Sequence, residues 1–339
     1  MPRPANRQLR IGISGWTYGP WRGVFYPPKL SQKRELEFAS CQLNSIEING
    51  SFYSLQTPNA YRTWYDATPK DFVFSLKGGR FLTHIKKLRD VRIPLANFLA
   101  SGVLLLKEKL GPILWQFPPN FAYDRERFAE FFKLLPHTTA EAAKLAREHD
   151  PKLKHRVWTE TDEDRPLRHA VEVRHASFEN CEFIELLREN DIALVFADSA
   201  GRWPYAEDVT SDFIYIRLHG DVEIYVSGYT DEALDAWAKK IKAWHEGGQP
   251  SDAKLLCPAL AARRKTKRDV FVYFDNDVKV RSPIDAITLS RKLGVPCGEI
   301  GGTYTDAVAQ YTTQHPTPLP ADRWRFGKRI PLRGRKAAD

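Results

Sequence analysis

Eight strand-like segments, nearly all separated by helical patterns, constrain the fold of this chain more than any other feature of its sequence. Short apolar runs next to turn residues predict buried strands, and apolar residues at three- and four-residue steps predict helices. The predicted strands span residues 9–16, 44–49, 71–77, 112–117, 170–175, 192–198, 213–219 and 269–275. A strand followed by a helix, repeated eight times, is typical of a (β/α)₈ TIM barrel, and we predict this α/β fold.

A doubly wound open sheet is the alternative for alternating strands and helices. In that fold the first strand usually ends in a glycine-rich phosphate turn that opens a helix. Here GWTYGPW at residues 15–21 follows the first strand and has a different pattern, so the barrel is preferred. We expect a single barrel domain over residues 9–296. A helical insertion at 137–168 precedes the fifth strand, and a basic, loosely ordered extension covers 297–339.

Helix ends have ordinary signals. Thr57 and Ser282 each precede a proline, which predicts an N-cap residue followed by proline in the first helical turn. Gly111 stands directly before the fourth strand and is predicted to end a helix over residues 95–110.

Polar side chains alternate with aliphatic ones near the ends of almost all the predicted strands. In a barrel, alternate strand residues face the interior, and sites lie at the carboxyl ends of the strands. The pattern predicts a ring of mixed charge at the barrel mouth, made of Glu47, Lys77, Glu172, Arg174, Asp198, Arg217, His219 and Asp277. In the last strand the pattern leaves open whether Asp275 with Asp277, or Asn276, points inward.

Burying such charges is costly unless they pair, bind a metal or meet a ligand. One interpretation of the ring is a structural network of ion pairs. In it, Arg174 pairs more easily with Asp198 or Glu47 on another strand than with Glu172 on its own. The functional interpretation is a pocket in which Lys77, Arg174 and Arg217 bind an anion such as phosphate or carboxylate. The candidate acid–base groups are then Glu47, Glu172, Asp198 and His219.

A divalent metal is a further expectation for this mouth. His84, in the loop after the third strand, together with His219 and the carboxylates, would suffice for a hard cation. No H-E-x-x-H or similar spacing supports it. His84 is equally suited to act as a hydrogen-bonding group.

Aromatic residues crowd the loops after the first two strands. They are Trp16, Tyr18, Trp21, Phe25, Tyr26, Phe52 and Tyr53. Such rings either stack on a sugar or a base or only cover the barrel mouth.

The net charge of +9 favours a phosphate-rich partner, but its distribution weakens that inference. Basic residues cluster in one loop, residues 263–268, and in the tail, residues 323–336. Such clusters bind nucleic acid by counterion release, or they are solvated surface charge.

The four cysteines, Cys41, Cys181, Cys257 and Cys297, lack a C-x-x-C pair. This spacing argues against a disulfide framework and a cysteine zinc site, and predicts reduced thiols. No apolar run is long enough to span a membrane or to form a signal peptide, so no membrane partner and a cytoplasmic location are expected.

Several short motifs are distinctive in combination. They are GISGWTYGPW at 12–21, SIEINGSFY at 45–53, FSLKGGRFLTH at 74–84, LGPILWQFPP at 110–119, AVEVRH at 170–175, YIRLHG at 215–220 and VYFDND at 272–277. Through these motifs, residues 9–293 resemble the domain-of-unknown-function 72 family, also called YecE-like. The resemblance implies a TIM barrel similar to the xylose isomerase-like and endonuclease IV-like barrels, and it implies no established reaction.

The pattern of that family falls on residues of the predicted ring and its surroundings. They are Glu47, Asn49, Lys77, His84, Gln116, Glu172, Arg174, Asp198, Arg217, His219 and Asn276. The sequence departs from the family pattern at Asp275, where many members have asparagine, and at Gly50, where serine is common. The histidine-rich set of endonuclease IV is not reproduced, so a trinuclear zinc site is not implied.

Three functions are consistent with these residues. The first is an enzyme, a hydrolase or isomerase with or without a metal, that acts on an anionic or phosphorylated substrate at the barrel mouth. Its substrate would contact Trp16, Tyr18, Asn49, Tyr53, Lys77, His84, Gln116, Arg174, Arg217 and Asn276. The second is a nucleic-acid-binding protein that uses the rim aromatics with the basic loop and tail. The third is a small-molecule sensor without catalysis. The oligomeric state is not indicated.

Overall fold

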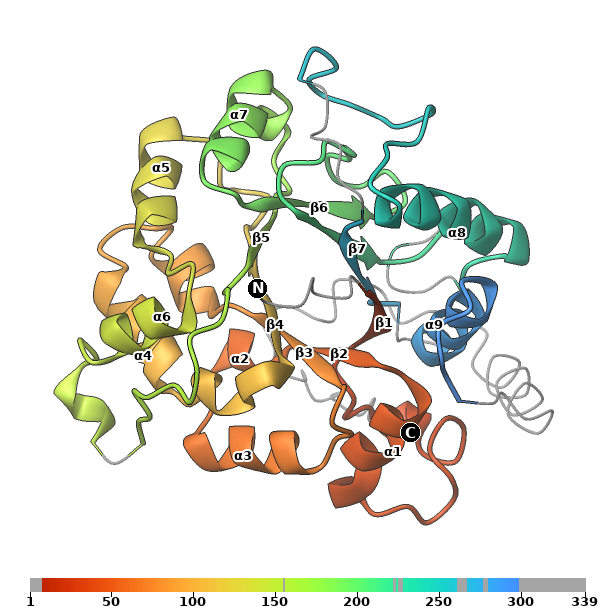
Figure 1. Cartoon of the computed structure of the whole chain (residues 1–339), viewed down its shortest axis with the longest axis horizontal. Helices are drawn as coiled ribbons and strands as arrows, with labels where there is room; N and C mark the ends of the chain where they lie inside the picture. The colour runs from red at the N-terminus through yellow and green to blue at the C-terminus, as the bar shows by residue number, and fades with distance from the viewer. Residues whose placement is uncertain are drawn as a thin grey trace, which may run out of the picture.

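Eight parallel strands close into a barrel in the computed structural model, which describes residues 8–154, 156–221, 224, 228–260, 267–276 and 280–298. The strands follow one another around the barrel in chain order (Figure 1). They are β1 (Leu9–Ser14), β2 (Ser45–Ile48), β3 (Val73–Lys77), β4 (Leu110–Gln116), β5 (His169–Glu172), β6 (Ala193–Asp198), β7 (Phe213–Leu218) and β8 (Asp269–Phe274). Because β1 pairs in parallel with β8, the sheet has no edge. The TIM-barrel prediction is confirmed, and the open sheet is excluded.

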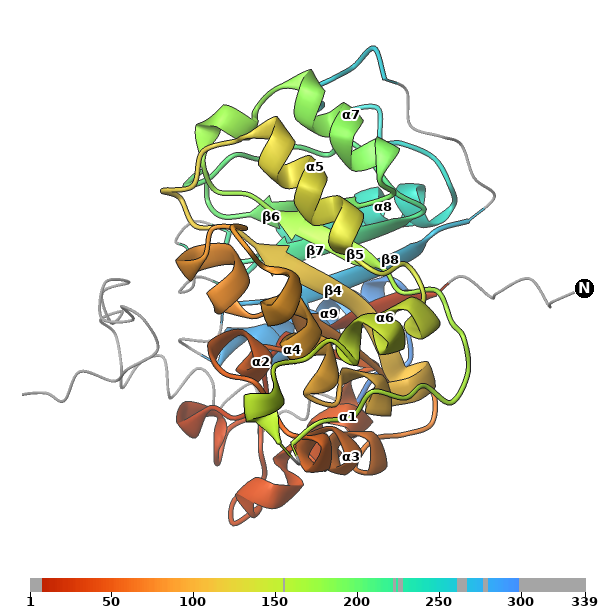
Figure 2. The same ribbon diagram turned by 90° about the vertical axis from the view of Figure 1, so that its left-hand side faces the viewer.

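Helices form the outer layer around the strands (Figures 1 and 2). They are α1 (Glu35–Gln42), α2 (Gly50–Tyr53), α3 (Pro58–Asp66), α4 (Arg92–Ala100), α5 (Arg125–Leu134), α6 (Thr139–Ala146), α7 (Cys181–Glu189), α8 (Asp231–His245) and α9 (Arg281–Lys292). The outward strand residues, such as Ile11 and Ile13, are buried against this layer. Among the helices of the described ranges, none is long and apolar enough to cross a membrane.

The barrel interior is a second, smaller apolar cluster. It contains Leu114, Ala170, Ala193, Val195, Ala197, Phe213, Tyr215, Phe271 and Tyr273. These residues alternate along their strands with the outward ones, as the pleat requires. They form the floor below the polar side chains at the carboxyl ends of the strands, so the mouth is the end where a site can form.

The close approach of β1 and β2 depends on Gly12. A Cβ atom added at this position would lie 1.9 Å from the carbonyl oxygen of Ser45, with which Gly12 is in register. Any other residue would therefore push the two strands apart.

The predicted helix ends have mixed outcomes. Thr57 is the N-cap of α3, where its Oγ1 accepts a hydrogen bond from the Ala60 amide. The predictions for Gly111 and Ser282 are wrong. Gly111 lies inside β4, where a Cβ would lie 2.7 Å from Val73 Cγ1, so the glycine is required by strand packing. Ser282 lies within α9, where its hydroxyl bonds to Asn276.

The segment before β5 contains α6, which follows α5 and lies within the predicted insertion. Its start is a capping box: the Thr138 hydroxyl accepts from the Glu141 amide, and the Glu141 carboxylate accepts from the Thr138 amide. The predicted C-terminal extension lies outside the described residues except for its first two residues, 297 and 298.

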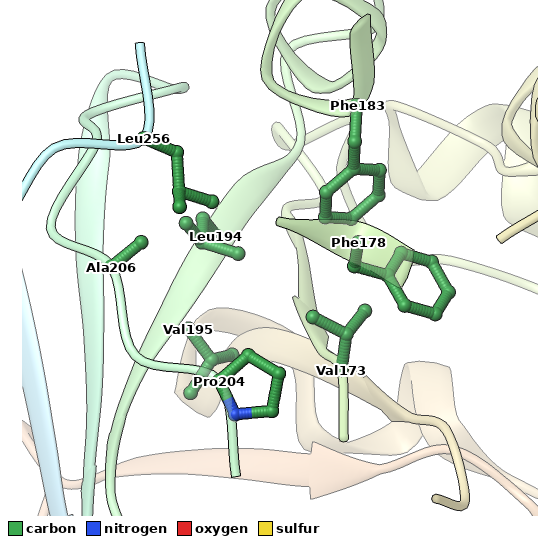
Figure 3. A pocket seen from close by; sticks show the side chains of 8 residues that line it. All are labelled: Val173, Phe178, Phe183, Leu194, Val195, Pro204, Ala206 and Leu256. Atoms are coloured by element: carbon green, nitrogen blue, oxygen red, sulfur yellow. The ribbon is translucent and has the colours of Figure 1, made fainter. Parts of the chain in front are cut away.

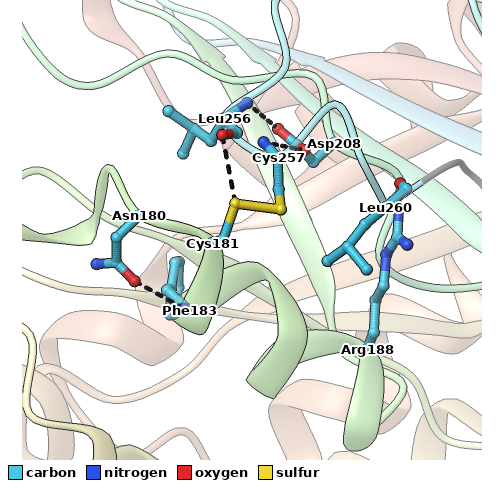
Figure 4. Close-up of a disulfide and its surroundings, with 8 residues drawn as sticks. All are labelled: Asn180, Cys181, Phe183, Arg188, Asp208, Leu256, Cys257 and Leu260. Atoms are coloured by element: carbon cyan, nitrogen blue, oxygen red, sulfur yellow. Dashed lines mark hydrogen bonds between the residues drawn. A yellow bond between two sulfur atoms is a disulfide. The ribbon is translucent and has the colours of Figure 1, made fainter.

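A disulfide joins Cys181 at the start of α7 to Cys257 (Figure 4). The prediction of reduced thiols is therefore wrong for these two residues. They are 76 residues apart in the sequence, and folding brings their Cα atoms to 5.1 Å. The Asp208 carboxylate holds the partner loop because it accepts hydrogen bonds from the backbone amides of Leu256 and Cys257. The spacing of the cysteines in the sequence does not predict this pairing.

Candidate active site

Charged side chains from five strands converge at the carboxyl end of the barrel. Glu47, Lys77, Glu172 and Arg217 lie on the inward face of β2, β3, β5 and β7, and Asp275 follows β8 with the same parity. Glu47, Glu172 and Arg217 are completely buried, and the Asp275 side chain retains 15% exposure. The alternation of polar and aliphatic residues along each strand therefore places these groups in one cluster.

Arg217 is the centre of this cluster. Its Nε and Nη2 donate to the two carboxylate oxygens of Glu47 at 3.1 and 2.9 Å. Nη1 donates to Glu172 Oε2 at 2.7 Å, and Nη2 also donates to Asp275 Oδ2 at 2.9 Å. One guanidinium thus connects β2, β5 and β7 to the end of β8. These charge-assisted bonds offset the cost of taking the four charges out of water.

The carboxylates remain ionised because of the arginines. Burial alone would raise the pKa of Glu172, but Arg174 and Arg217 hold that pKa well below its ordinary value. For Asp275, burial is likewise outweighed by Arg217 and His219, and its pKa is about 2. Burial alone would lower the pKa of Arg217, but the surrounding carboxylates hold it well above its ordinary value.

A layer of hydroxyl groups fixes Glu47 from below. Tyr215 donates to Glu47 Oε2 at 2.6 Å, and its hydroxyl is also 2.8 Å from Ser75 Oγ. Ser14 Oγ donates to Glu47 Oε1 at 3.0 Å. With Arg217 on the same two oxygens, both oxygen atoms of Glu47 are occupied. Tyr215 and Ser75 were not among the predicted site residues, although their inward parity was a signal that could have identified them.

Glu172 is bound by two further side chains. Gln116 Nε2 donates to its Oε1 at 2.8 Å, and Arg174 Nε donates to the same oxygen at 2.7 Å. The expectation that Arg174 would pair across strands is wrong, because β5 ends at Glu172 and the Arg174 guanidinium, two residues further on, binds that same carboxylate. The Arg174 guanidinium lies 3.6 Å from the centroid of the Trp203 ring, and 13% of its side chain is exposed.

His219 lies directly beyond β7, next to this network. Its Nδ1 is 3.1 Å from Asp275 Oδ2, and its Nε2 is 3.8 Å from Glu172 Oε2. The Trp203 ring contacts the imidazole edge to face, and the side chain is fully buried. Nε2 also lies 3.5 Å from Arg217 Nη1, so the imidazole is placed between a carboxylate and a guanidinium. An imidazole beside a carboxylate is a common group for proton transfer. The open question about β8 is also answered, because Asp275 points inward.

Lys77 lies at the end of β3 and differs from the other charges. Its Nζ is 4.4 Å from the centroid of the Phe52 ring, and only 7% of the residue is exposed. In the parts of the chain that the structure describes, no carboxylate is within ion-pair distance of this ammonium group. Burial, together with the nearby Arg217 charge, lowers the pKa of Lys77 to about 8.

Two polar residues lie on the Lys77 side of the mouth. The imidazole of His84 packs on Phe52, and its Nδ1 is 2.9 Å from Thr83 Oγ1. Burial and the positive charges of Lys77 and Arg174 lower the pKa of His84 to about 3, so the ring is neutral. Asn49, on the inward parity of β2, has a buried Oδ1 that accepts no hydrogen bond from the described residues. A neutral imidazole and a carboxamide thus lie beside an unpaired cation.

Two of the predicted site residues, Asp198 and Asn276, lie outside the cluster. Asp198 has the outward parity of β6, and its Oδ2 accepts from Tyr229 at 3.0 Å. Asn276 is also outward: its Nδ2 donates to Asp285 Oδ2 at 2.8 Å and its amide group bonds to Ser282. Asp198 was expected on the inward face and Asn276 was one of two alternatives for it, but each follows an inward residue by one position. The predicted ring member Asp277 lies outside the described residues.

The rim aromatics mainly cover the barrel. Trp21, Phe25 and Tyr26 are buried and pack on one another. Trp16 meets Trp64 of α3 edge to face, and the Tyr18 hydroxyl donates to the Ser14 carbonyl. Tyr53, by contrast, is 54% exposed. Three of the aromatic side chains of the first loop therefore belong to the core, where stacking on a ligand is not open to them.

This fold and these motifs agree with the comparisons. The sequence profile described as "Protein of unknown function DUF72" matches residues 10–307. The chain belongs to the DUF72 family. A curated relative, the UPF0759 protein YunF of Bacillus subtilis, is 28% identical over 132 residues. That match covers 36% of this chain and 44% of the relative, so the aligned part spans less than half of the relative.

Solved structures of other DUF72 proteins have the same fold. One from Thermotoga maritima superposes with a TM-score of 0.61 at 23% identity, covering 85% of this chain and 99% of the other. Another, from Enterococcus faecalis, has a TM-score of 0.59 at 16% identity, with coverages of 87% and 98%. At these identities the similarity establishes the barrel.

The mouth of this DUF72 chain does not fit the expected metal site. Across the described ranges, no three His, Cys, Asp or Glu side chains are arranged to hold a metal ion. The reason lies in the geometry of the cluster, since the guanidinium of Arg217 lies between Glu47, Glu172 and Asp275. A cation placed among these oxygens would have to displace another cation. His84 and His219 also have different partners, because His84 bonds to Thr83 whereas His219 lies against Asp275.

Two hollows lie away from the charged cluster. A small apolar one lies between β5, β6 and α7 and is lined by residues such as Val173, Phe183 and Leu194 (Figure 3). A wider groove of about 360 Å³ includes Asp198, Tyr205 and Trp237 in its lining. The first lacks polar side chains that could bind a polar ligand.

Proposed function

We propose that this DUF72 protein is an enzyme that acts on an anionic small molecule at the carboxyl-terminal mouth of the barrel. One observation carries the proposal: His219, whose Nδ1 lies 3.1 Å from the Asp275 carboxylate, shares the mouth with Lys77, a buried cation without a carboxylate partner among the described residues. The first pair supplies proton transfer, and the second attracts an anion.

The binding role belongs to the Lys77 side of the mouth. A buried ammonium group that no protein carboxylate neutralises is stabilised when a ligand brings negative charge. Burial, together with the positive charges of Lys77 and Arg174, lowers the pKa of His84, so this side of the mouth has a neutral imidazole. Asn49 adds a polar oxygen that accepts no hydrogen bond from the described residues and suits a ligand hydroxyl. Phosphate and carboxylate groups both match this environment.

Arg217, which the sequence suggested as an anion ligand, is assigned a positioning role instead. Its donors point at Glu47, Glu172 and Asp275, so a substrate would have to break existing bonds to reach it. Glu47 has both oxygens occupied and is likewise a positioning residue. Glu172 binds Arg174 and lies 3.8 Å from His219.

Hydrolase and isomerase chemistry both fit these residues, since each requires a proton to move to or from an oxygen or carbon of the substrate. No step is assigned to a metal, because the donor geometry does not suit one.

Nucleic-acid binding has less support. Trp21, Phe25 and Tyr26 of the first loop are buried, and Arg268 of the basic loop is also buried, with Nη1 donating to the Gly248 carbonyl. Most of the basic loop, and the basic tail, lie outside the described residues.

The proposal is tested by binding and turnover together. Inorganic phosphate, small carboxylates, sugar phosphates and nucleotides are screened by calorimetry, and any that bind are followed by nuclear magnetic resonance for conversion. We expect Lys77→Met to weaken anion binding at least tenfold, as the loss of a charge-assisted contact requires. Lys70→Met, which removes an exposed lysine, is the control.

His219→Ala separates catalysis from binding. The variant is expected to bind the anion and to lose turnover by a factor of 10² or more, about the contribution of one general acid–base group. If no anion binds the wild-type protein, or if His219→Ala retains full turnover, the proposal fails.

A further inference from the structure

Two lysines are buried in this barrel, and they have opposite surroundings. Lys109, which precedes β4, is 4% exposed, and its Nζ donates to the Tyr65 carbonyl, the Thr68 carbonyl and Thr68 Oγ1 at 2.6–3.1 Å. These bonds use all three of its protons. Lys77 is 7% exposed, and its Nζ lies over the face of the Phe52 ring. Lys109 is therefore a structural lysine, whereas Lys77 has no such explanation.

The backbone around Lys77 is held rigidly. Ser51 Oγ donates to the Lys77 carbonyl at 2.7 Å, and the Gly78 amide donates to the Leu114 carbonyl at 2.8 Å. A Cβ at Gly78 would lie 2.3 Å from the Trp115 ring, so the strand end packs tightly on β4. The side chain therefore leaves a fixed backbone and extends into the mouth.

We propose that Lys77 is a covalent nucleophile that forms an imine with the ketone or aldehyde group of an anionic substrate. The inference rests on the proposed function, because it places the substrate at the same mouth. It goes further by naming the substrate class, a small anionic carbonyl compound such as a keto acid or a keto sugar phosphate.

The environment favours the amine form that such a reaction needs. Lysine nucleophiles are activated by an apolar surrounding or by an adjacent cation, both of which disfavour the ammonium ion. Lys77 has both, since it is buried against Phe52 and is close enough to Arg217 to be affected by its charge. The carboxylates of Glu47, Glu172 and Asp275 oppose this effect but do not cancel it.

The step balances without an oxidant or reductant. The lone pair of the neutral Lys77 Nζ attacks the carbonyl carbon, a C–N bond forms, and the C=O π electrons move to oxygen. A proton passes from nitrogen to that oxygen and gives a carbinolamine. A second proton, for which His219 is the available donor, goes to the hydroxyl group. The C–O bond then breaks, water leaves and a protonated imine remains. Hydrolysis by the reverse route frees the lysine.

Arg174 and Lys77 would bind the two ends of the substrate, its anionic group and its carbonyl group. Arg174 retains an exposed part at the mouth while it is bound to Glu172 and stacked on Trp203, so its charge can face an anionic group. Lys77 then takes the carbonyl end. A small molecule with both functions satisfies both cations.

Reductive trapping tests the imine on the full-length protein. Dihydroxyacetone phosphate, pyruvate and neutral dihydroxyacetone are each incubated with the protein and sodium cyanoborohydride, and the adducts are located by peptide mass spectrometry. We expect a single saturable adduct on Lys77 with at least one anionic carbonyl. It should form at least tenfold faster than adducts on exposed lysines such as Lys70 and be slowed by excess inorganic phosphate.

Two variants and one internal control make the result specific. Lys77→Arg retains the positive charge but has no amine of this kind, so the saturable adduct should disappear while phosphate binding remains. Lys77→Met should lose both. Lys109, equally buried but fully hydrogen bonded, should stay unmodified in every sample. Adducts spread over exposed lysines, an unchanged adduct in Lys77→Arg, or no Lys77 adduct with either anionic carbonyl would each overturn the inference.

The outcomes also separate the two proposals. Phosphate binding without a Lys77 adduct leaves the proposed function standing and removes the imine. Equal trapping of neutral dihydroxyacetone and its phosphate supports the imine but removes the anionic substrate. Absence of both binding and trapping rejects both.

Discussion

The buried charge of Lys77 destabilises the folded protein, and the same residue carries the imine chemistry that we propose. Its folded pKa of about 8 lies below the ordinary value of 10.5, so the folded protein holds this proton less tightly than the unfolded chain does. By linkage, its charge destabilises the fold most below about pH 8, and the penalty declines as the pH rises toward 10.5. A residue that destabilises the protein at neutral pH is retained more readily when it has a function.

Lys77→Met is therefore expected to stabilise the free protein. At pH 7 the gain in unfolding free energy should be about 1–3 kcal/mol, the usual cost of a buried group that lacks a partner. The gain should shrink between pH 8 and 10. Calorimetric melting temperatures over this pH range measure it, with Lys70→Met as the exposed control. A variant that melts below the wild-type protein at pH 7 would show that Lys77 is a structural residue.

At the scale of single elements, strand packing requires particular residues that local sequence patterns do not predict. Gly12 illustrates this for β1, because its neighbour Ser45 leaves no room for a Cβ atom. Gly19 follows the same strand, and a Cβ there would meet nothing within 4 Å. Gly19 is therefore a suitable control position for a substitution at Gly12.

Gly12→Ala is expected to destabilise the barrel by about 3 kcal/mol or more, since a Cβ placed 1.9 Å from a backbone oxygen must shift a strand. Gly19→Ala should change the unfolding free energy by less than about 0.5 kcal/mol. Denaturant unfolding followed by circular dichroism compares them. Equal stabilities for the two variants would contradict the packing assigned to β1 and β2.

The disulfide between Cys181 and Cys257 ties α7 to the loop before β8. Closing a loop of this length restricts the unfolded chain, and its loss typically costs about 2–4 kcal/mol. We therefore expect Cys181→Ser to lower the melting temperature and to abolish the effect of added reductant. Cys41→Ser, which removes an exposed free thiol, is the control. Identical melting of wild-type protein with and without reductant would rule out a stabilising role.

At the scale of the whole molecule, the network around Arg217 connects strands on different sides of the barrel. Glu47 on β2, Glu172 on β5 and Asp275 after β8 all bind one guanidinium from β7. Removing charge from this network affects the closure of the barrel, because the interactions run across its interior.

Low pH should therefore unfold the protein by protonating these carboxylates. The folded pKa of Asp275 is about 2 and its ordinary value is 3.8, and the pKa of Glu172 is also depressed. A carboxylate with a lowered pKa contributes stability above its unfolded pKa and loses it as the pH falls toward the folded value. We expect the unfolding free energy to fall steeply between about pH 4 and pH 2.

Asp275→Asn tests the share of this carboxylate in the acid sensitivity. The variant should be less stable than the wild-type protein at pH 7, because a buried ion pair is broken, and its stability should depend less on pH below 4. Urea unfolding at several pH values measures both. A variant with an unchanged pH dependence would show that other groups govern acid unfolding.

The sequence by itself determined the barrel and most of its inward polar residues. The two-residue period of a strand assigns Glu47, Lys77, Glu172, Arg217 and His219 to one face, and eight strand–helix repeats direct that face into a common interior. This part could be predicted because each strand carries its own pattern.

Only the tertiary structure decided which groups meet. The placement of Asp275 inward and of Asp198 and Asn276 outward depends on where β6 and β8 enter the barrel, and a shift of one residue reverses the faces. Arg174 pairs with Glu172 just beyond the end of β5, and the disulfide joins residues 76 positions apart. Such contacts depend on distances between separate segments, which the order of residues along one segment does not encode.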